Sequence, residues 1–196
     1  MIKSGTRFVS FAVGAVIAVA ALSGCASETP SGGEPSASAS TPKPEQSVAE
    51  PTPTGDAIPP ANLPTDCLAL GTAETREETV GDMTLQSNGE GFVRPAPEGA
   101  TLALGCDWIV GDATGVLLLI STASANAVSQ ALTTLPAEGY TCQPAEDFGA
   151  QFCDLPGDGA DTEEMIVARD DVWIYMSTAN RNGRAFLSDI VQGIFG

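Results

Sequence analysis

The sequence predicts an α+β fold, an antiparallel sheet with helices on one face, formed by a single domain over residues 62–196. Two observations support this expectation. Pairs of apolar runs typical of strand hairpins occur twice, and each pair is followed by an amphipathic helical segment. The same stretch has the usual length of one domain and holds four of the five cysteines, an even number that suits two disulfides in an exported chain.

Each expected element follows from apolar spacing and from the residues that end it. In the segment 124–135, Val128, Leu132 and Leu135 recur at helical spacing, and Pro136 ends the helix. In chain order, we expect a helix at 65–79, a loop with one short strand at 80–100, strands at 101–110 and 116–123, a helix at 124–135, a hairpin within 139–155, strands at 164–169 and 172–179, and a helix at 184–195.

A weak internal repeat relates two parts of the domain. "VLLLISTASAN" (116–126) and "VWIYMSTANRN" (172–182) share Val, Ser-Thr-Ala and Asn at an offset of 56 residues, although the helices that follow align better at an offset of 59. Two strand–strand–helix units would build the antiparallel sheet with its helices on one face. Convergence of two ordinary hairpin–helix units explains the match about as well.

The four cysteines of the domain allow three pairings, and we predict Cys67–Cys106 together with Cys142–Cys153. The second pair flanks a segment that can form a hairpin, whose ends the bridge would close. Spacing alone leaves the other two pairings open. The competing interpretation is a four-cysteine zinc site, but the chain has no C-x₂-C spacing of the kind that such sites use.

The N-terminus has the parts of a secretory signal peptide, which we place at residues 1–24. Lys3 and Arg7 precede an apolar run at 8–22, which is shorter than the ~17–25 residues that span a bilayer. The run ends in Leu-Ser-Gly-Cys, which resembles the bacterial lipobox. That resemblance implies that Cys25 receives a diacylglyceryl group and becomes the mature N-terminus, where two acyl chains anchor stably. An ordinary cleaved signal, with Cys25 as a free thiol, is the alternative.

Residues 25–61 are rich in Ser, Thr and Pro and nearly lack large apolar side chains, so we expect a disordered tether. Removing Lys3 and Arg7 with the signal peptide changes the formal net charge from −17 to about −19. Such an acidic protein should repel nucleic acid and anionic lipid head groups. We expect a monomer on the extracytoplasmic face of the cell membrane. Its expected partners are the membrane, through the lipid on Cys25, and an unidentified envelope protein or small ligand.

The sequence excludes most catalytic chemistry. The chain lacks histidine, and its lysines are Lys3 in the signal peptide and Lys43 in the tether, so the domain lacks the common bases that activate Ser, Thr or Cys. No Walker A or dinucleotide motif occurs. We predict no catalytic residues, no cofactor and no metal site, since the acidic segment 154–164 departs from the spacing of a calcium loop. A carboxylate pair, as in glycoside hydrolysis, is the surviving enzymatic alternative.

Five side chains are candidates for ligand binding: Trp108, Trp173 and Tyr175 as the lining of a groove, with Arg181 and Arg184 as a basic pair beside Trp173. Aromatic residues in alternating strands are more often half-buried sheet residues. A binding module would show a groove or an exposed apolar patch, whereas a hydrolase would show two facing carboxyl groups about 5–10 Å apart. A purely structural envelope protein would show neither.

Two short motifs inside the domain carry a family resemblance. "DCLAL" (66–70) and "CDW" (106–108) are similar to the cysteine-containing opening and the Cys-x-Trp strand of small actinobacterial envelope lipoproteins. With the lipobox and the tether, this resemblance implies location and architecture, and it brings no catalytic residues with it. We therefore predict a membrane-anchored lipoprotein whose extracytoplasmic domain is a non-catalytic binding module.

Overall fold

The computed structural model describes residues 60–196. The predicted signal peptide, the lipobox with Cys25 and all but the last residues of the tether lie outside the described residues. Within residues 60–196, no helix is long and apolar enough to cross a membrane.

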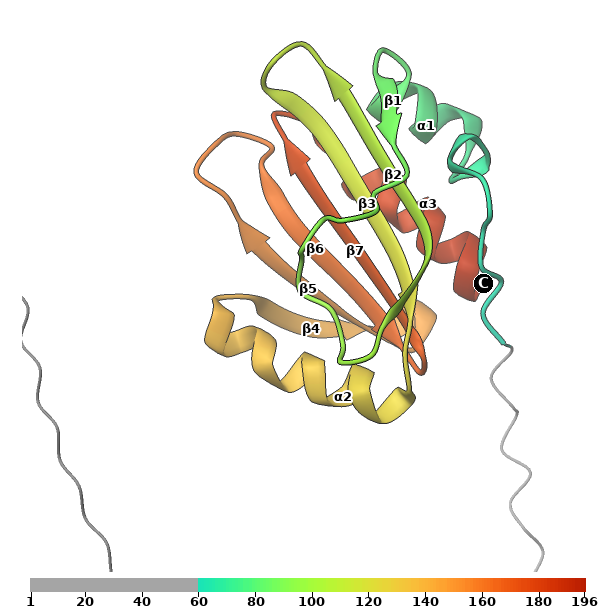
Figure 1. Ribbon diagram of the computed structural model, residues 1–196, viewed down its shortest axis with the longest axis vertical. Coiled ribbons are helices and arrows are strands. Elements are labelled where there is room, and N and C mark those ends of the chain that lie inside the picture. Colours follow the sequence, from blue (N-terminus) through green and yellow to red (C-terminus); the bar gives the residue numbers. More distant parts are fainter. Residues whose placement is uncertain (1–59) are drawn as a thin grey trace, which may run out of the picture. The chain divides into compact units, whose positions relative to one another are not determined.

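Seven antiparallel strands form one sheet in the order β1-β2-β3-β7-β6-β5-β4 (Figure 1), which confirms the predicted α+β class. The strands are β1 (Thr84–Ser87), β2 (Thr101–Val110), β3 (Thr114–Thr122), β4 (Thr141–Ala145), β5 (Ala150–Pro156), β6 (Glu163–Arg169) and β7 (Val172–Ala179). The helical elements are η1 (Cys67–Ala69), α1 (Ala73–Val80), α2 (Ala125–Thr134), η2 (Leu135–Glu138), η3 (Glu146–Phe148) and α3 (Arg184–Phe195).

The helices cover both faces of the sheet, so the prediction that they lie on one face is wrong. Side chains of β3 alternate between two apolar clusters. Leu118 and Ile120 point to the first face, where α1 and α3 pack, and Leu117 and Leu119 point to the second face, where α2 packs. Figure 1 shows α2 in front of the sheet and α3 behind it. Because both faces are covered, the central strands are apolar almost throughout instead of alternating with polar residues.

The two predicted strand–strand–helix units are present as β2-β3-α2 and β6-β7-α3. Their second strands pair at the centre of the sheet, with Val116 opposite Thr178 and Thr122 opposite Val172. The connections to the helices differ, because two residues separate β3 from α2 and four separate β7 from α3. Asn180 in the longer connection has a left-handed conformation with φ of 52°. The longer connection leads to α3 on the face opposite α2. Its two additional residues supply most of the change in offset from 56 for the strands to 59 for the helices.

The helix expected at 65–79 is two elements in the structure, the short η1 and the helix α1. Gly71 separates them with a φ of 60°, and a Cβ at this position would lie 2.9 Å from the ring of Phe186. Thr72 then caps α1 by accepting a hydrogen bond from an amide of the first turn. The break lets the chain pass close to α3, where Phe186 also packs edge-to-face against Trp108 with ring centroids 6.1 Å apart.

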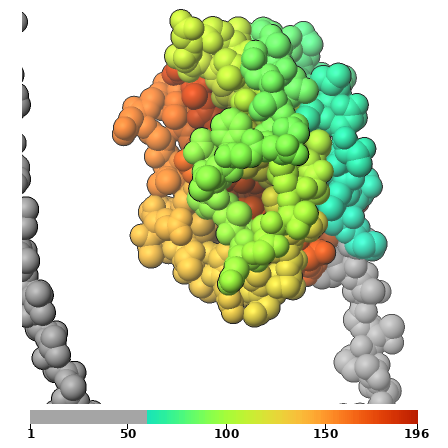
Figure 2. Space-filling model, in the orientation of Figure 1, coloured from blue at the N-terminus to red at the C-terminus, as the bar shows by residue number. Residues whose placement is uncertain are grey.

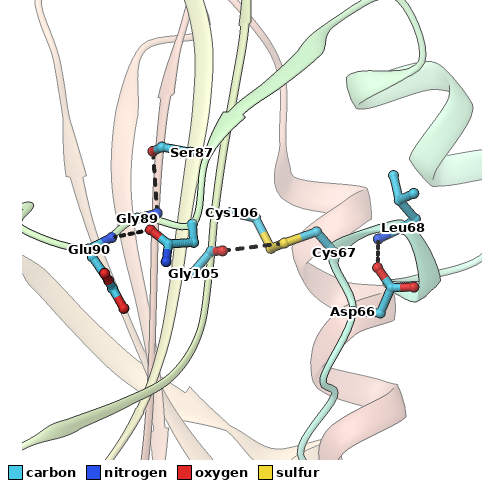
Figure 3. Close-up of a disulfide and its surroundings, with 9 residues drawn as sticks. Asp66, Cys67, Leu68, Ser87, Gly89, Glu90, Gly105 and Cys106 are labelled. Atoms are coloured by element: carbon cyan, nitrogen blue, oxygen red, sulfur yellow. Dashed lines mark hydrogen bonds between the residues drawn. A yellow bond between two sulfur atoms is a disulfide. The ribbon is translucent and has the colours of Figure 1, made fainter.

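Both predicted disulfides, Cys67–Cys106 and Cys142–Cys153, are present. The first joins η1 to β2 with its Cα atoms 5.9 Å apart, and Figure 3 shows it across the β2 backbone from the turn that contains Gly89. The second links register partners on the adjacent strands β4 and β5. One bridge therefore holds the N-terminal segment of the domain on the sheet, and the other closes a hairpin at the sheet edge.

Candidate functional site

The loop between β1 and β2 crosses the second face of the sheet (Figure 1). It covers a pocket on that face. Figure 2 shows an opening framed by this loop in green, with red atoms from the C-terminal part of the chain behind it. We call this space, with a volume of about 170 Å³, the loop pocket. Phe92, Arg94 and Pro95 belong to its loop side, and Leu102, Leu119, Ser121, Trp173 and Tyr175 form its floor on the sheet.

Two glycines allow the start of the loop to lie directly on the sheet. A Cβ on Gly105 of β2 would lie 2.1 Å from the carbonyl oxygen of Asn88, so a larger residue would displace the loop. Gly89 has a φ of 72°, and a Cβ there would lie 2.6 Å from Leu119 Cδ2. The Gly89 amide also donates to Ser87 Oγ at 3.3 Å (Figure 3). Backbone contact with the sheet therefore sets the height of the loop above the pocket floor.

Trp173 fastens the far part of the loop. Its indole N–H donates to the carbonyl oxygen of Pro95 at 3.0 Å. Because Trp173 is almost fully buried in β7, this bond holds the loop against a rigid part of the sheet. Phe92 and Val93 stay exposed on the same loop, at 41% and 91%. The pocket is thus pre-formed, with a fixed floor and a tethered cover.

Tyr175 belongs to the floor of the loop pocket, but its hydroxyl oxygen is shielded from solvent and has no hydrogen bond of good geometry. Burial raises the pKa of Tyr175 above its usual range; the charge of Glu164 adds to the rise, and that of Arg94 opposes it. Ser177 and Glu164 also act on this pKa as hydrogen-bonding neighbours, and neither of them lines the loop pocket. The phenol therefore stays protonated in the physiological pH range.

Tyr175→Phe removes this hydroxyl and keeps the ring. We expect the free energy of unfolding to stay equal or to rise by up to about 1 kcal/mol, because the variant no longer buries an unpartnered polar group. Tyr140→Phe is the matched control and should lose about 2 kcal/mol, because the Tyr140 hydroxyl donates to Glu164 Oε2 at 2.5 Å. Urea unfolding measures both. If Tyr175→Phe loses more than about 1 kcal/mol, the hydroxyl is already bonded within the protein.

The structure brings two of the three candidate aromatic residues together. Trp173 and Tyr175 lie side by side in the loop pocket and are almost fully buried. Trp108 lies on the first face, 2% exposed, in contact with Phe186. The three aromatic rings therefore do not line one groove, and Trp108 is part of the core.

The two candidate arginines lie in ion pairs outside the loop pocket. Arg181 Nη2 bonds both carboxylate oxygens of Asp82, at 3.0 and 2.9 Å. Arg184 donates to Asp154 Oδ2 at 3.1 Å and through two nitrogens to the carboxylate of Glu163. Charge-assisted bonds of this kind fix the side chains. Neither arginine is among the residues that line the loop pocket.

The sequence prediction missed Arg94 and Ser121, which line the loop pocket together with Trp173 and Tyr175. One signal could have pointed to Arg94, since it is the single basic residue of the segment 80–100. It also follows two apolar residues in a segment otherwise rich in Gly and Pro. No comparable signal marks Ser121, whose place in the floor depends on the pairing of β3 with its neighbours.

A second cavity of about 280 Å³ lies on the first face, between α3 and the edge strands β4 and β5. Its lining is mostly apolar and includes Phe148, Phe152 and Leu187. Arg184 stands at its rim, with its guanidinium carbon 5.6 Å from the centroid of the Phe152 ring. None of the unpartnered buried polar atoms found in residues 60–196 belongs to this lining. The cavity offers mostly apolar surface without a buried polar group that lacks a partner.

Carboxylates do come together at one place on the first face. Asp154 and Glu163 both accept hydrogen bonds from Arg184, whose guanidinium lies between them. This arrangement is a salt-bridge cluster with its charges balanced by arginine. In the described part of the chain, no three Asp, Glu or Cys side chains are grouped closely enough to hold a metal ion.

Comparison of the chain with protein-family models, with curated proteins and with solved structures finds no match. The binding properties of the loop pocket therefore follow from its own geometry. Mostly apolar side chains form its floor, and Arg94 belongs to its loop side.

Proposed function

We propose that this chain is a lipoprotein, anchored through a lipid on Cys25 at the extracytoplasmic face of the cell membrane, and that its domain is a non-catalytic binding module with the loop pocket as ligand site. The observation behind the binding role is the covered, mostly apolar loop pocket, whose one charged lining residue, Arg94, has no carboxylate within 4.0 Å among residues 60–196. A concave, mostly apolar space with a charged group at its side is typical of a small-molecule site.

The remaining groups favour binding over hydrolysis. The domain has no histidine or lysine, and the carboxylates of Asp154 and Glu163 are engaged by Arg184 instead of facing an open cleft. A purely structural role would not explain the covered pocket. The exposed Phe92 and Val93 on the cover also fit a protein whose second face meets other molecules.

Binding can be tested with the two tryptophans as reporters, because they lie on opposite faces of the sheet. Benzoate, benzyl alcohol and benzylamine are added separately at millimolar concentration to the folded protein. We expect the indole N–H signal of Trp173 in the NMR spectrum to shift with at least one of these probes, while that of Trp108 stays in place. Absence of any shift at Trp173 with all three probes would contradict the binding role of the loop pocket.

Anchoring can be tested by replacing Cys25 in cells of a lipoprotein-processing bacterium. Cys25→Ala removes the thiol that would carry the lipid, so we expect the protein to move from the membrane fraction to the medium or the soluble fraction. Ser23→Ala is the matched control, because it keeps a small residue before Gly24 and should leave the protein in the membrane. Equal membrane retention of wild type and Cys25→Ala would overturn the proposed lipid anchor.

A further inference from the structure

The loop pocket has room for a group about the size of an aromatic ring. Its volume is about 170 Å³, and an apolar cavity of ~150 Å³ is enough to hold benzene. Leu119 and Trp173 on the floor and Phe92 on the loop provide apolar contact surface. The part of a ligand that enters the pocket is therefore ring-sized and largely apolar.

The charge of the lining is opposite to that of the protein. Asp and Glu outnumber Lys and Arg by 25 to 8 in the chain. Among the described residues that line the loop pocket, however, Arg94 is the one with a charged side chain. Glu164 lies outside the lining, and at the Tyr175 hydroxyl its charge acts more strongly than that of Arg94. The positive charge available to a ligand is therefore that of Arg94, on the loop side of the pocket.

Arg94 is available to such a group. Its guanidinium makes a long contact of 3.5 Å with the carbonyl oxygen of Val93 and lies 5.9 Å from the centroid of the Phe92 ring. Within residues 60–196, no carboxylate lies within 4.0 Å of it, whereas Arg181 and Arg184 are each held by carboxylates. The positive charge of Arg94 is thus not neutralised by the protein around it.

The lining has few polar side chains. The Tyr175 hydroxyl is shielded from solvent and therefore from a molecule in the pocket, whereas Ser121 lies on the same floor. Glu164, whose charge acts on Tyr175, is not part of the lining and already accepts a hydrogen bond from Tyr140. A bound molecule would therefore meet Arg94 as the charged group of the lining, and its matching group is an acceptor with negative charge.

From this combination we infer that the loop pocket binds a small molecule that carries a carboxylate on a ring-sized apolar body. Arg94 pairs with the carboxylate, and Leu119 and Trp173 contact the apolar body. The inference rests on the proposed binding function of the pocket and adds the chemical class of the ligand.

The test compares three probes of equal size and different charge: benzoate, benzyl alcohol and benzylamine. Each is titrated into the folded protein, and the shift of the Trp173 indole signal gives the dissociation constant. We expect benzoate to bind with a dissociation constant on the order of 1 mM, as suits so few atoms. Benzyl alcohol should bind about tenfold more weakly, because it lacks the charge that pairs with Arg94.

Variants assign the roles of the two polar groups. Arg94→Gln should weaken benzoate about tenfold and leave benzyl alcohol unchanged, and Arg76→Gln is the control with the same change in net charge outside the pocket. Tyr175→Phe keeps the ring and should leave benzoate binding unchanged, because the Tyr175 hydroxyl is shielded from the pocket. Circular dichroism verifies that each variant is folded.

The outcomes separate this inference from the proposed function. Benzylamine binding as tightly as benzoate, with Trp173 shifting, would overturn the carboxylate class and leave the pocket as a binding site. Benzoate binding unaffected by Arg94→Gln would overturn the role of Arg94. No shift of Trp173 with any probe would overturn both the ligand class and the binding role of the loop pocket.

Discussion

Replacing Phe186 with alanine is expected to lower the free energy of unfolding by about 4 kcal/mol. Phe186 lies in α3 and is fully buried on the first face. Its ring contacts Trp108 edge-to-face and fills the space next to Gly71, so its removal leaves a cavity at the junction of α3, β2 and the N-terminal segment. The surrounding backbone is tied by a disulfide and a sheet and cannot collapse far into that cavity. Urea unfolding, followed by far-UV circular dichroism, measures the loss.

Phe92→Ala is the matched control for this experiment. Phe92 is a phenylalanine of the same size that is 41% exposed on the loop, so its truncation should change the free energy of unfolding by less than about 0.5 kcal/mol. Because Phe92 lines the loop pocket, the same variant should bind benzoate more weakly. Equal losses of stability in Phe186→Ala and Phe92→Ala would contradict the core role assigned to α3.

Removing the Cys67–Cys106 bridge is expected to cost about 4 kcal/mol, and removing Cys142–Cys153 about 3 kcal/mol. The expected order follows from the length of chain that each bridge closes, since the sequence separations are 39 and 11 residues. A bridge that closes a longer loop restricts the unfolded chain more. Removing that bridge therefore stabilises the unfolded state more. The paired variants Cys67→Ala/Cys106→Ala and Cys142→Ala/Cys153→Ala are compared by urea unfolding.

The two double variants serve as controls for each other, because each keeps one bridge and loses two sulfur atoms. Titration of the unfolded, unreduced wild-type domain should find no free thiol among these four cysteines. A larger loss for the short bridge than for the long one would contradict the loop-length explanation. That result would indicate that the Cys142–Cys153 bridge stabilises the protein mainly through the native hairpin of β4 and β5 at the sheet edge.

Local sequence patterns predicted those helices and hairpins that are determined by residues close together in the sequence. The helix expected at 124–135 is α2 in the structure, because the spacing of Val128, Leu132 and Leu135 and the stop at Pro136 depend only on neighbouring residues. Strand hairpins and the pairing of Cys142 with Cys153 were predictable for the same reason. The helix expected at 65–79 failed at Gly71, because its conformation depends on the contact with Phe186, far along the chain.

The face on which each helix lies did not follow from sequence. The apolar runs in β3 and β7 indicate that these strands are buried. A continuous apolar run, however, fits a strand covered on both faces and also a strand covered on one face in which polar residues alternate only weakly. A difference of two residues between the two strand–helix connections places α2 and α3 on opposite faces. Periodicity reports which residues are buried and not the direction in which a short connection turns.

The sequence by itself predicted that the domain is α+β with an antiparallel sheet, and its composition shows that residues 62–196 contain no histidine and no lysine. These properties depend on composition and on short-range patterns. The structure decided among the three possible cysteine pairings in favour of the predicted Cys67–Cys106 and Cys142–Cys153. Only the tertiary structure decided that Arg94 and Tyr175 share one pocket, because Gly89 and Gly105 allow the loop to lie on the sheet and Trp173 holds it there. Sites of this kind arise from contacts between residues far apart in sequence, which no local pattern encodes.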